Sequence, residues 1–484
     1  MSLKAVRKLA AGLLGPDGVV EDPAGLRSYS CDGLTGWRAT PGLVVLPTTT
    51  EEVSSIVAAC HKHSVPFVAR GSGTGLSGGA LPATDGVLIV TSRMRRILEI
   101  DPDNRIAVVE PGVTNASVSV AAAPFGLYYA PDPSSQIVCS IGGNVAENSG
   151  GAHCLKYGFT TNHVLGVEVV LPDGTVTTLG GMTTETPGYD LRAVFVGSEG
   201  ILGITTKVML RLLPKAEAVR TFVADFASPE EAGEAVTAII AAGIVPSAVE
   251  MMDHLAIQAS EAATSAGYSL EAGAALIVEL DGPRGDCEAE FARSVELCKQ
   301  AKASKIRVAA GEAERQLIWK GRKAAFAAAG RLSPSYYVQD GVIPRTALGR
   351  VLRRISELSE AESILVANVF HAGDGNLHPL VLYNPAVSGE GERAERLASQ
   401  IVAICVEEGG SITGEHGVGV DKACSMPKMF SEHDLATMKK VRDAFDPAGL
   451  ANPGKLFPTP RLCGETPGPY RPHPTELAGV AERF

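Results

Sequence analysis

The chain has 484 residues, 45% hydrophobic and 20% charged, with a formal net charge of −11. This length predicts two or three units sharing a large buried core. The acidic balance and the lack of a basic stripe argue against a nucleic acid partner, and no apolar segment is long enough to span a bilayer. Nine dispersed cysteines without a Cys-x-x-Cys pair predict a reducing, cytoplasmic setting and no iron–sulfur motif.

The first 215 residues alternate short strands with helices and are dense in glycine. After a first helix that ends near Leu14, strands are expected at Leu43–Leu46, Val65–Ala69 and Val87–Thr91. A helix is expected at Thr50–His63, capped by its first residue.

A glycine-rich loop, Arg70–Gly79, follows the second of these strands. Its Gly73, Gly75 and Gly78 match the G-x-G-x-x-G dinucleotide pattern, but a loop and a strand follow instead of a helix, so a Rossmann site is excluded. No Gly-Lys-Ser/Thr follows either, which excludes a P-loop. The loop can still present backbone N–H groups to phosphate oxygens; the alternative is an ordinary surface loop.

Two further loops are rich in small residues and amides, Tyr128–Gly151 and Val196–Ile204. Such residues let the backbone approach a flat ligand closely and supply hydrogen bonds without bulk. Three loops of this kind in one unit predict a large cofactor that lies extended across it.

From Lys215 the pattern predicts a second, α+β domain of one sheet with helices packed on it. Its expected strands and helices are Phe222–Phe226, Pro229–Ala242, Ala274–Leu280, Cys287–Ala301, Glu312–Gly330 and Gly391–Glu408, and a further helix is expected after it at Glu432–Phe445. Arg322, in the fifth of these segments, could clamp a carboxylate, although a solvated helix-face charge is the commoner role of a lone arginine.

The stretch Val369–Pro379 reads as a hairpin with a Gly373–Asn376 loop. That loop would place His371 directly opposite His378, roughly 5 Å apart between Cβ atoms, a distance that suits a shared divalent metal. Glu415 and His416 stand between glycines downstream, where packing does not call for an acid and an imidazole. Hydrogen-bonded core or surface histidines are the alternative.

Long runs of this sequence resemble the FAD-linked oxidases of the vanillyl-alcohol-oxidase (PCMH) type. Within these the chain is most similar to the D-2-hydroxyacid dehydrogenase branch, which includes the FAD-linked D subunit of bacterial glycolate oxidase. The runs are Cys31–Leu34, Pro131–Gln136, Gly142–Asn148, Glu250–Asp253, Asn368–His371 and Glu482–Phe484.

The resemblance implies an α+β, two-domain PCMH-type fold. Residues 1–215 would form the FAD domain, with a core from about 38, residues 216–430 the substrate domain over the flavin, and residues 431–484 a segment that completes the FAD site. The cofactor residues implied are Arg70, Gly71, Ser72, Gly73, Thr74, Gly75, Ser77, Pro133, Ser134, Gly142, Gly143, Asn144, Asn148, Gly151, Glu199, Gly203, Ile204, Asn452 and Lys455. Because Arg70–Gly79 contains no histidine that could tether the flavin, we expect non-covalent FAD.

The resemblance also implies a divalent metal, zinc, on His371, His378 and Glu415, with His416 as the base and Arg322 on the substrate carboxylate. Glycolate is the expected substrate and D-lactate the alternative. D-2-hydroxyglutarate fits less well, because the relatives that oxidise it place polar residues where Phe326, Val338 and Leu380 stand here.

Electrons must leave the flavin for oxygen, a quinone or another polypeptide. The resemblance implies a second flavoprotein-like subunit and an iron–sulfur subunit, close to the inner membrane. A non-catalytic FAD-binding subunit is the alternative from another class, against which His371, His378, Glu415 and His416 argue.

Overall fold

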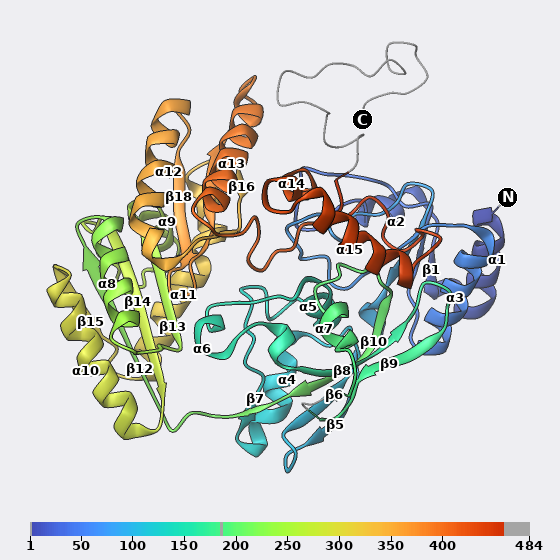
Figure 1. Ribbon diagram of the computed structural model, residues 1–484, viewed down its shortest axis with the longest axis horizontal. Coiled ribbons are helices and arrows are strands. Elements are labelled where there is room, and N and C mark those ends of the chain that lie inside the picture. Colours follow the sequence, from blue (N-terminus) through green and yellow to red (C-terminus); the bar gives the residue numbers. More distant parts are fainter. Residues whose placement is uncertain (1, 184–186, 459–484) are drawn as a thin grey trace.

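A computed structural model describes residues 2–183 and 187–458. It shows two units of mixed helices and sheets side by side (Figure 1). We call residues 2–214 the N-terminal unit and residues 218–425 the second unit. The Glu482–Phe484 run of the resemblance lies outside the described residues.

The first sheet of the N-terminal unit has the strand order β1-β2-β4-β3. Its three longer strands are parallel, and β1 runs antiparallel to β2. Helices α1 and α3 cover the sheet with an apolar core. The bounds are α1 Ser2–Leu14, β1 Val19–Val20, β2 Leu43–Val45, α3 Thr50–His63, β3 Phe67–Arg70 and β4 Val87–Val90.

The cap of α3 differs from the prediction by one residue. Thr49, not Thr50, is the N-cap, and its hydroxyl accepts a hydrogen bond from the Glu52 N–H at 3.2 Å. Thr50 is buried and donates instead to Glu168 Oε1 at 2.8 Å. The Thr50 hydroxyl therefore makes a tertiary contact instead of capping the helix, and the sequence pattern does not reveal that contact.

The second sheet of this unit is antiparallel, with the order β5-β6-β10-β8-β9. Its inner face packs against α4, α5 and α7. The bounds are β5 Ile97–Asp101, β6 Ile106–Val109, α4 Asn115–Ala122, α5 Ile141–Glu147, β8 Val164–Val170, β9 Val176–Gly180, α7 Leu191–Phe195 and β10 Ile204–Arg211.

One large sheet organises the second unit, in the order β15-β12-β14-β13-β18-β19-β17, with β20 beside β18 and β16 beside β20. Side chains alternate along its strands: Phe222, Ala224 and Phe226 face one core, whereas Val223 faces the other. The bounds are β12 Ala218–Phe226, β13 Ala248–Asp253, β14 Ala274–Gly282, β15 Lys305–Val308, β16 Ser335–Val338, β17 Gly341–Val342, β18 Val366–His371, β19 Asn376–Leu377 and β20 Pro379–Tyr383.

Helices cover both faces of this sheet. Buried residues of α8, α10, α12 and α13 belong to one core, and those of α9 and α11 belong to the other. The bounds are α8 Pro229–Ala241, α9 His254–Thr264, α10 Arg284–Gln300, α11 Glu312–Ala328, α12 Leu348–Glu362 and α13 Glu390–Glu407.

After the second unit, the chain returns to the first. Helices α14 (Met426–Met429) and α15 (Glu432–Phe445) lie over the N-terminal unit (Figure 1). The Phe67 N–H then donates to Leu450 O at 2.9 Å, and the Asn452 N–H donates to Phe67 O at 2.8 Å. The closing segment therefore pairs with the free edge of the first sheet.

The predicted hairpin is present, but its register differs from the prediction by two residues. His371 pairs with Asn376, and Asn368 pairs with Pro379, so the turn is 372–375 and His378 is not directly opposite His371. A shift of two residues keeps each side chain on its face of the sheet. The two imidazoles are therefore diagonal neighbours on one face, with ring centroids 5.0 Å apart.

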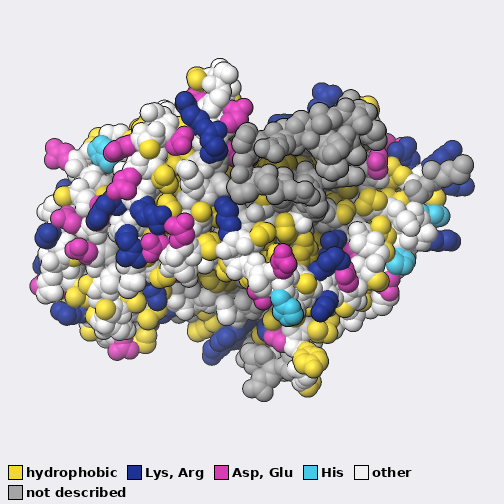
Figure 2. Space-filling view, turned by 45° about the horizontal axis from the view of Figure 1, so that its top comes forward, with side chains coloured by type: hydrophobic (Ala, Val, Ile, Leu, Met, Phe, Trp, Pro, Cys, Tyr) yellow, Lys and Arg dark blue, Asp and Glu magenta, His cyan; other side chains and the backbone are white. Residues whose placement is uncertain are grey.

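No helix among the described residues is long and apolar enough to cross a membrane. On the face drawn in Figure 2, acidic and basic side chains are interspersed, without a continuous basic stripe.

Gly375 in the hairpin turn should be intolerant of substitution. It has φ +81°, and an added Cβ would lie 2.1 Å from Ile343 O. We expect Gly375→Ala to cost about 1–2 kcal/mol for the dihedral angle and about 1–3 kcal/mol more for the overlap. Gly389→Ala is the matched control, because Gly389 has φ +78° with nothing within 4 Å. Thermal unfolding of the two FAD-loaded variants checks this; equal losses of stability would contradict it.

Candidate active site

A cavity of about 1370 Å³ lies between the two units. Residues of all three predicted cofactor loops line it, and so do His378, Glu415 and His416 from the second unit. The predicted cofactor residues on its wall are Arg70, Gly71, Ser72, Gly73, Thr74, Gly75, Pro133, Ser134, Gly142, Gly143, Asn144, Glu199, Gly203 and Ile204. The predicted cofactor loops and the histidine cluster thus open onto one space.

The loop after β3 is held tightly against its surroundings. Ser72 Oγ donates to Val138 O at 2.7 Å, and Arg70 Nη1 donates to Cys31 O at 2.7 Å. Gly73 has φ +69°, and a Cβ there would lie 2.2 Å from the Arg70 guanidinium. A side chain at Gly71 would meet Ser140 Oγ at 2.1 Å. This part of the cavity wall therefore consists of backbone without side chains. An extended ligand with phosphate groups can approach its N–H groups closely.

Five predicted cofactor residues do not line the cavity: Ser77, Asn148, Gly151, Asn452 and Lys455. Asn452 Nδ2 donates to Gly79 O at 2.8 Å and to Glu199 O at 2.6 Å. Lys455 Nζ donates to Leu81 O at 2.8 Å. These two buried residues of the closing segment therefore fix the backbone of the loops that line the cavity.

His371, His378 and Glu415 meet around a single carboxylate oxygen. Glu415 Oε1 lies 3.2 Å from His371 Nε2 and 3.1 Å from His378 Nε2. One ligand atom from each residue lies within 4.8 Å of the other two. Two imidazoles and a carboxylate converging in this way are a donor set for a divalent metal that leaves further coordination positions open.

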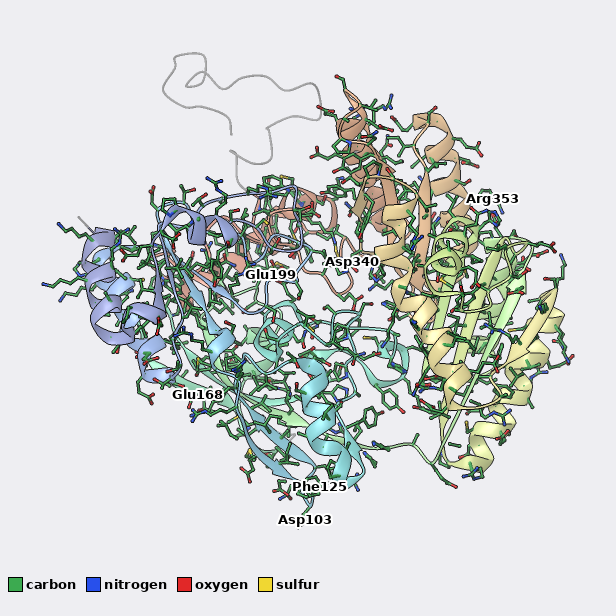
Figure 3. The ribbon with its side chains drawn as sticks, turned by 180° about the vertical axis from the view of Figure 1, so that it is seen from behind. Asp103, Phe125, Glu168, Glu199, Asp340 and Arg353 are labelled. Atoms are coloured by element: carbon green, nitrogen blue, oxygen red, sulfur yellow. The ribbon has the colours of Figure 1, made fainter. Side chains whose placement is uncertain are left out.

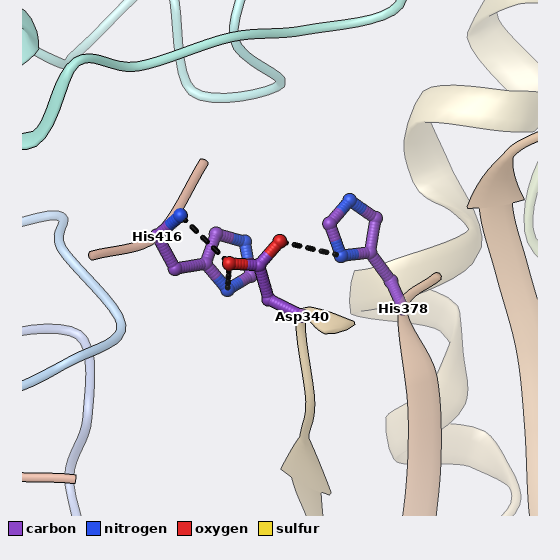
Figure 4. A group of neighbouring side chains, drawn as sticks. All are labelled: Asp340, His378 and His416. Atoms are coloured by element: carbon purple, nitrogen blue, oxygen red, sulfur yellow. Dashed lines mark hydrogen bonds and ion pairs between the residues drawn. The ribbon is translucent and has the colours of Figure 1, made fainter. Parts of the chain in front are cut away.

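A carboxylate faces the other nitrogen of each histidine. Glu250 Oε1 lies 2.7 Å from His371 Nδ1, and Asp340 Oδ1 lies 3.7 Å from His378 Nδ1. Carboxylates behind histidines typically fix the ring orientation of metal ligands. Figure 4 shows Asp340 between His378 and the loop that carries His416.

Asp340 also fixes the turn of Glu415 and His416. Its Oδ2 accepts hydrogen bonds from the Gly414 and His416 N–H groups, each at 2.9 Å, and from Thr413 Oγ1 at 2.5 Å. Lys422 Nζ lies 3.4 Å away. The Asp340 side chain is fully buried, so these donors replace the water that a carboxylate would otherwise need.

The charges of this cluster suit a bound cation. Burial alone would lower the pKa of His371, but Glu250 and Glu415 raise it well above its ordinary value. The buried carboxylates of Glu250 and Asp340 face the buried cations Arg322 and Lys422, and the mostly buried carboxylate of Glu415 faces the two imidazoles. A divalent metal would take the place of the proton that these carboxylates otherwise favour on His371, so the donor set and its charges both fit such a metal.

Arg322 is close to this cluster but does not line the cavity. It is 2% exposed, and its Nη2 lies 2.5 Å from Glu250 Oε2. Its Nε has no hydrogen-bond partner among the described residues. In this arrangement Arg322 supports Glu250, and through it His371. To reach a substrate carboxylate, it must turn away from Glu250.

His416 lies on the cavity wall with its ring stacked on His378, the centroids 5.0 Å apart. Burial lowers its pKa to about 4, although Asp340 opposes that shift. The imidazole is therefore neutral at neutral pH and able to accept a proton.

An apolar wall faces the histidines. Phe326 and Val338 line the cavity, and the Phe326 ring lies 5.8 Å from that of His378. Leu380 is fully buried and pairs with Val338 across two strands. The side chains of Phe326, Val338 and Leu380 themselves therefore offer a second carboxylate of a substrate no partner.

Sequence reasoning missed the roles of Asp340 and Glu250, and the cavity residues Glu147 and Lys323. Glu250 had a signal, because it is an acid within the apolar segment Ala248–Met252. Asp340 lies two residues after the end of β16 and directly before Gly341, and in the sequence Asp-Gly reads as an ordinary turn. Their partners are distant in sequence, so local patterns cannot reveal them.

Comparisons with known proteins agree with this architecture. Residues 41–180 match the model of an FAD binding domain, and residues 215–456 match that of the C-terminal domain of FAD linked oxidases. A 4-ethylphenol oxidase from Gulosibacter chungangensis has a similar structure, with a TM-score of 0.78 at 20% identity over 94% of this chain and 97% of that one.

Curated relatives align over most of their length. The glycolate oxidase subunit GlcD of Escherichia coli K12 is 53% identical over 90% of this chain and 88% of the relative. GlcD of Bacillus subtilis 168 is 37% identical over 94% and 97%. A D-lactate dehydrogenase of Archaeoglobus fulgidus is 32% identical over 86% and 91%. With the fold and the two domain matches, these likenesses show that the chain belongs to the FAD-linked oxidases, a family of flavoprotein oxidoreductases.

Proposed function

We propose that this flavoprotein oxidises glycolate to glyoxylate, with D-lactate as the alternative substrate. The observation that carries the proposal is the cavity that joins the glycine-rich loops to His378, Glu415 and His416. The higher identity to glycolate oxidase subunits than to a D-lactate dehydrogenase supports this order of substrates.

In this proposal, each residue of the cluster has a distinct task. His371, His378 and Glu415 would hold a divalent metal, zinc. When bound, the metal would act as a Lewis acid on the hydroxyl and carboxylate oxygens of the substrate, and FAD would accept the hydride from Cα. His416 takes the hydroxyl proton; its Nδ1 lies 4.0 Å from Asp340 Oδ2, which leaves Nε2 for the proton. Arg322 would hold the carboxylate after turning away from Glu250.

The apolar wall supports a small substrate. A second carboxylate against Phe326 and Val338 would be desolvated without a partner, which is costly. A wall of this kind discriminates weakly between glycolate and D-lactate, since one methyl group is worth about 1–3 kcal/mol. D-2-hydroxyglutarate is therefore the least favoured of the three.

We further propose that the electrons pass to partner subunits, one flavoprotein-like and one that carries iron–sulfur clusters. Two relatives are themselves named as subunits of glycolate oxidase, which supports an assembly of several chains. The protein would lie in the cytoplasm, peripheral to the inner membrane through these partners, with non-covalent FAD. Nucleic acid is not among the proposed partners.

Replacing His416 by alanine should lower kcat for glycolate by about 10²–10⁴-fold, because the proton acceptor is lost. The FAD content should stay at the wild-type level, since no cofactor loop changes. Stopped-flow bleaching of the flavin under anaerobic conditions measures this, with a substitution of the exposed His61 of α3, His61→Ala, as the control. Unchanged turnover would favour the alternative of a non-catalytic FAD-binding subunit.

Removing the metal should stop flavin reduction without releasing FAD. We expect a chelator to abolish bleaching by glycolate, and added Zn²⁺ to restore it in the wild type but not in His371→Ala. Elemental analysis of the same samples gives the metal content. Full activity in protein shown to be metal-free would contradict the metal proposal, while the FAD assignment would stand.

The Val338→Lys variant should gain activity toward D-2-hydroxyglutarate. A lysine on the wall supplies a partner for the second carboxylate, worth about 1.5–3 kcal/mol, or roughly a tenfold or larger rise in kcat/KM. Val338→Met fills similar space without charge and serves as the control. If the two variants oxidise D-2-hydroxyglutarate equally well, this wall does not determine the substrate specificity.

A further inference from the structure

Two acidic side chains meet at the junction of the units, beside the turn that follows His416. Glu147 ends α5, and Glu199 lies in the turn after α7 with φ +52°. Both line the cavity. They approach the same point from two sides: an added Cβ at Gly417 would lie 2.1 Å from Glu147 Oε2 and 3.1 Å from Glu199 Oε1.

Only one of the two acids has the hydrogen bonds that a carboxylate needs. Glu199 Oε1 accepts from the Val418 N–H at 2.7 Å, and its Oε2 accepts from the Gly419 N–H at 2.6 Å. Glu147 Oε2 is buried without a hydrogen-bond partner in the described part of the chain. An unpaired buried oxygen costs far less on a neutral acid than on an ionised one. The negative charge therefore belongs on Glu199 and the proton on Glu147.

The surrounding charges agree with this assignment. Burial, the neighbouring Glu199 and the more distant Asp32 raise the pKa of Glu147 well above its ordinary value, and Lys422 and Lys455 only partly offset them. A neutral acid beside an ionised one is the usual outcome when two carboxyl groups share a buried site.

The other oxygen of Glu147 lies against the predicted phosphate-binding loop. An added Cβ at Gly79 would be 2.4 Å from Glu147 Oε1, and one at Gly75 would be 3.9 Å from it. An ionised acid here would repel the diphosphate of FAD, whereas a neutral acid can donate a hydrogen bond to it or to a flavin carbonyl.

We propose that Glu147 remains protonated in the folded enzyme and donates a hydrogen bond from Oε1 to the bound FAD, while Glu199 carries the charge of the pair. This role depends on FAD in the cavity and not on which hydroxy acid is oxidised. Both tests below use the substrate-free holoenzyme, so their failure is distinct from a failure of the proposed function.

Infrared spectroscopy of the holoenzyme at pH 8 tests the protonation of Glu147. This pH lies above the pKa of about 6 of the buried Asp253, so few other acids stay neutral. The wild-type minus Glu147→Gln difference spectrum should contain the carbonyl stretch of a protonated carboxylic acid. Glu168→Gln is the matched control, because Lys207, Thr50 and Thr206 keep Glu168 ionised, and its difference spectrum should lack that band. A Glu147→Gln difference that shows only carboxylate bands would overturn the proposal.

The rate of FAD release from the holoenzyme tests the hydrogen bond. Glu147→Gln keeps a neutral donor and should release FAD within about twofold of the wild-type rate. Glu147→Met removes the donor and should release it roughly tenfold faster, the effect of one lost hydrogen bond. Equal rates in the two variants would show that Glu147 does not contact the cofactor. If the methionine variant fails to fold, the infrared comparison can still overturn the proposal.

Discussion

Asp340 is the buried carboxylate on which the geometry of the site depends. It is fully buried, and N–H and O–H donors of residues 413–416 surround its Oδ2. An ionised group in such surroundings is stable only while every donor stays in place. The Glu415–His416 turn therefore has one low-energy arrangement. Because Asp340 Oδ1 also faces His378 Nδ1, one side chain relates the candidate base to the candidate metal ligands.

The same turn is held from the opposite side by the N-terminal unit. Glu199 accepts the N–H groups of Val418 and Gly419, and Ser77 O accepts those of Val420 and Asp421. Figure 3 labels Glu199 and Asp340 near the centre of the molecule, where the two units meet. Because Asp340 and Glu199 both fix this turn, residues from the two units line one cavity in a well-defined relative position. This is the preorganisation that a catalytic site needs.

Local patterns predicted the elements well and the long-range pairings poorly. The hairpin register was wrong by two residues, yet His371 and His378 still share a face, because a strand repeats every two residues. The role of Arg322 at the substrate stays a prediction, whereas its ion pair with Glu250, 72 positions earlier in the sequence, was not foreseen. The place of Asn452 and Lys455 over the flavin ring also stays a prediction, whereas their hydrogen bonds to Gly79 O and Leu81 O were not foreseen. Each of these contacts joins residues that are distant in the sequence, so local patterns do not reveal it.

The size of the cavity explains why specificity must come from a few residues. Ligand cavities usually measure about 300–1000 Å³, and this one measures about 1370 Å³, far more than a two- or three-carbon acid occupies. In the proposed arrangement, most of the space serves the extended FAD along the glycine-rich loops, which leaves the end near His378 and His416 for a substrate. Phe326 and Val338 form the wall at that end. On the proposed function, a change of one of these side chains should alter which substrate is accepted there, while the backbone that contacts the cofactor stays the same.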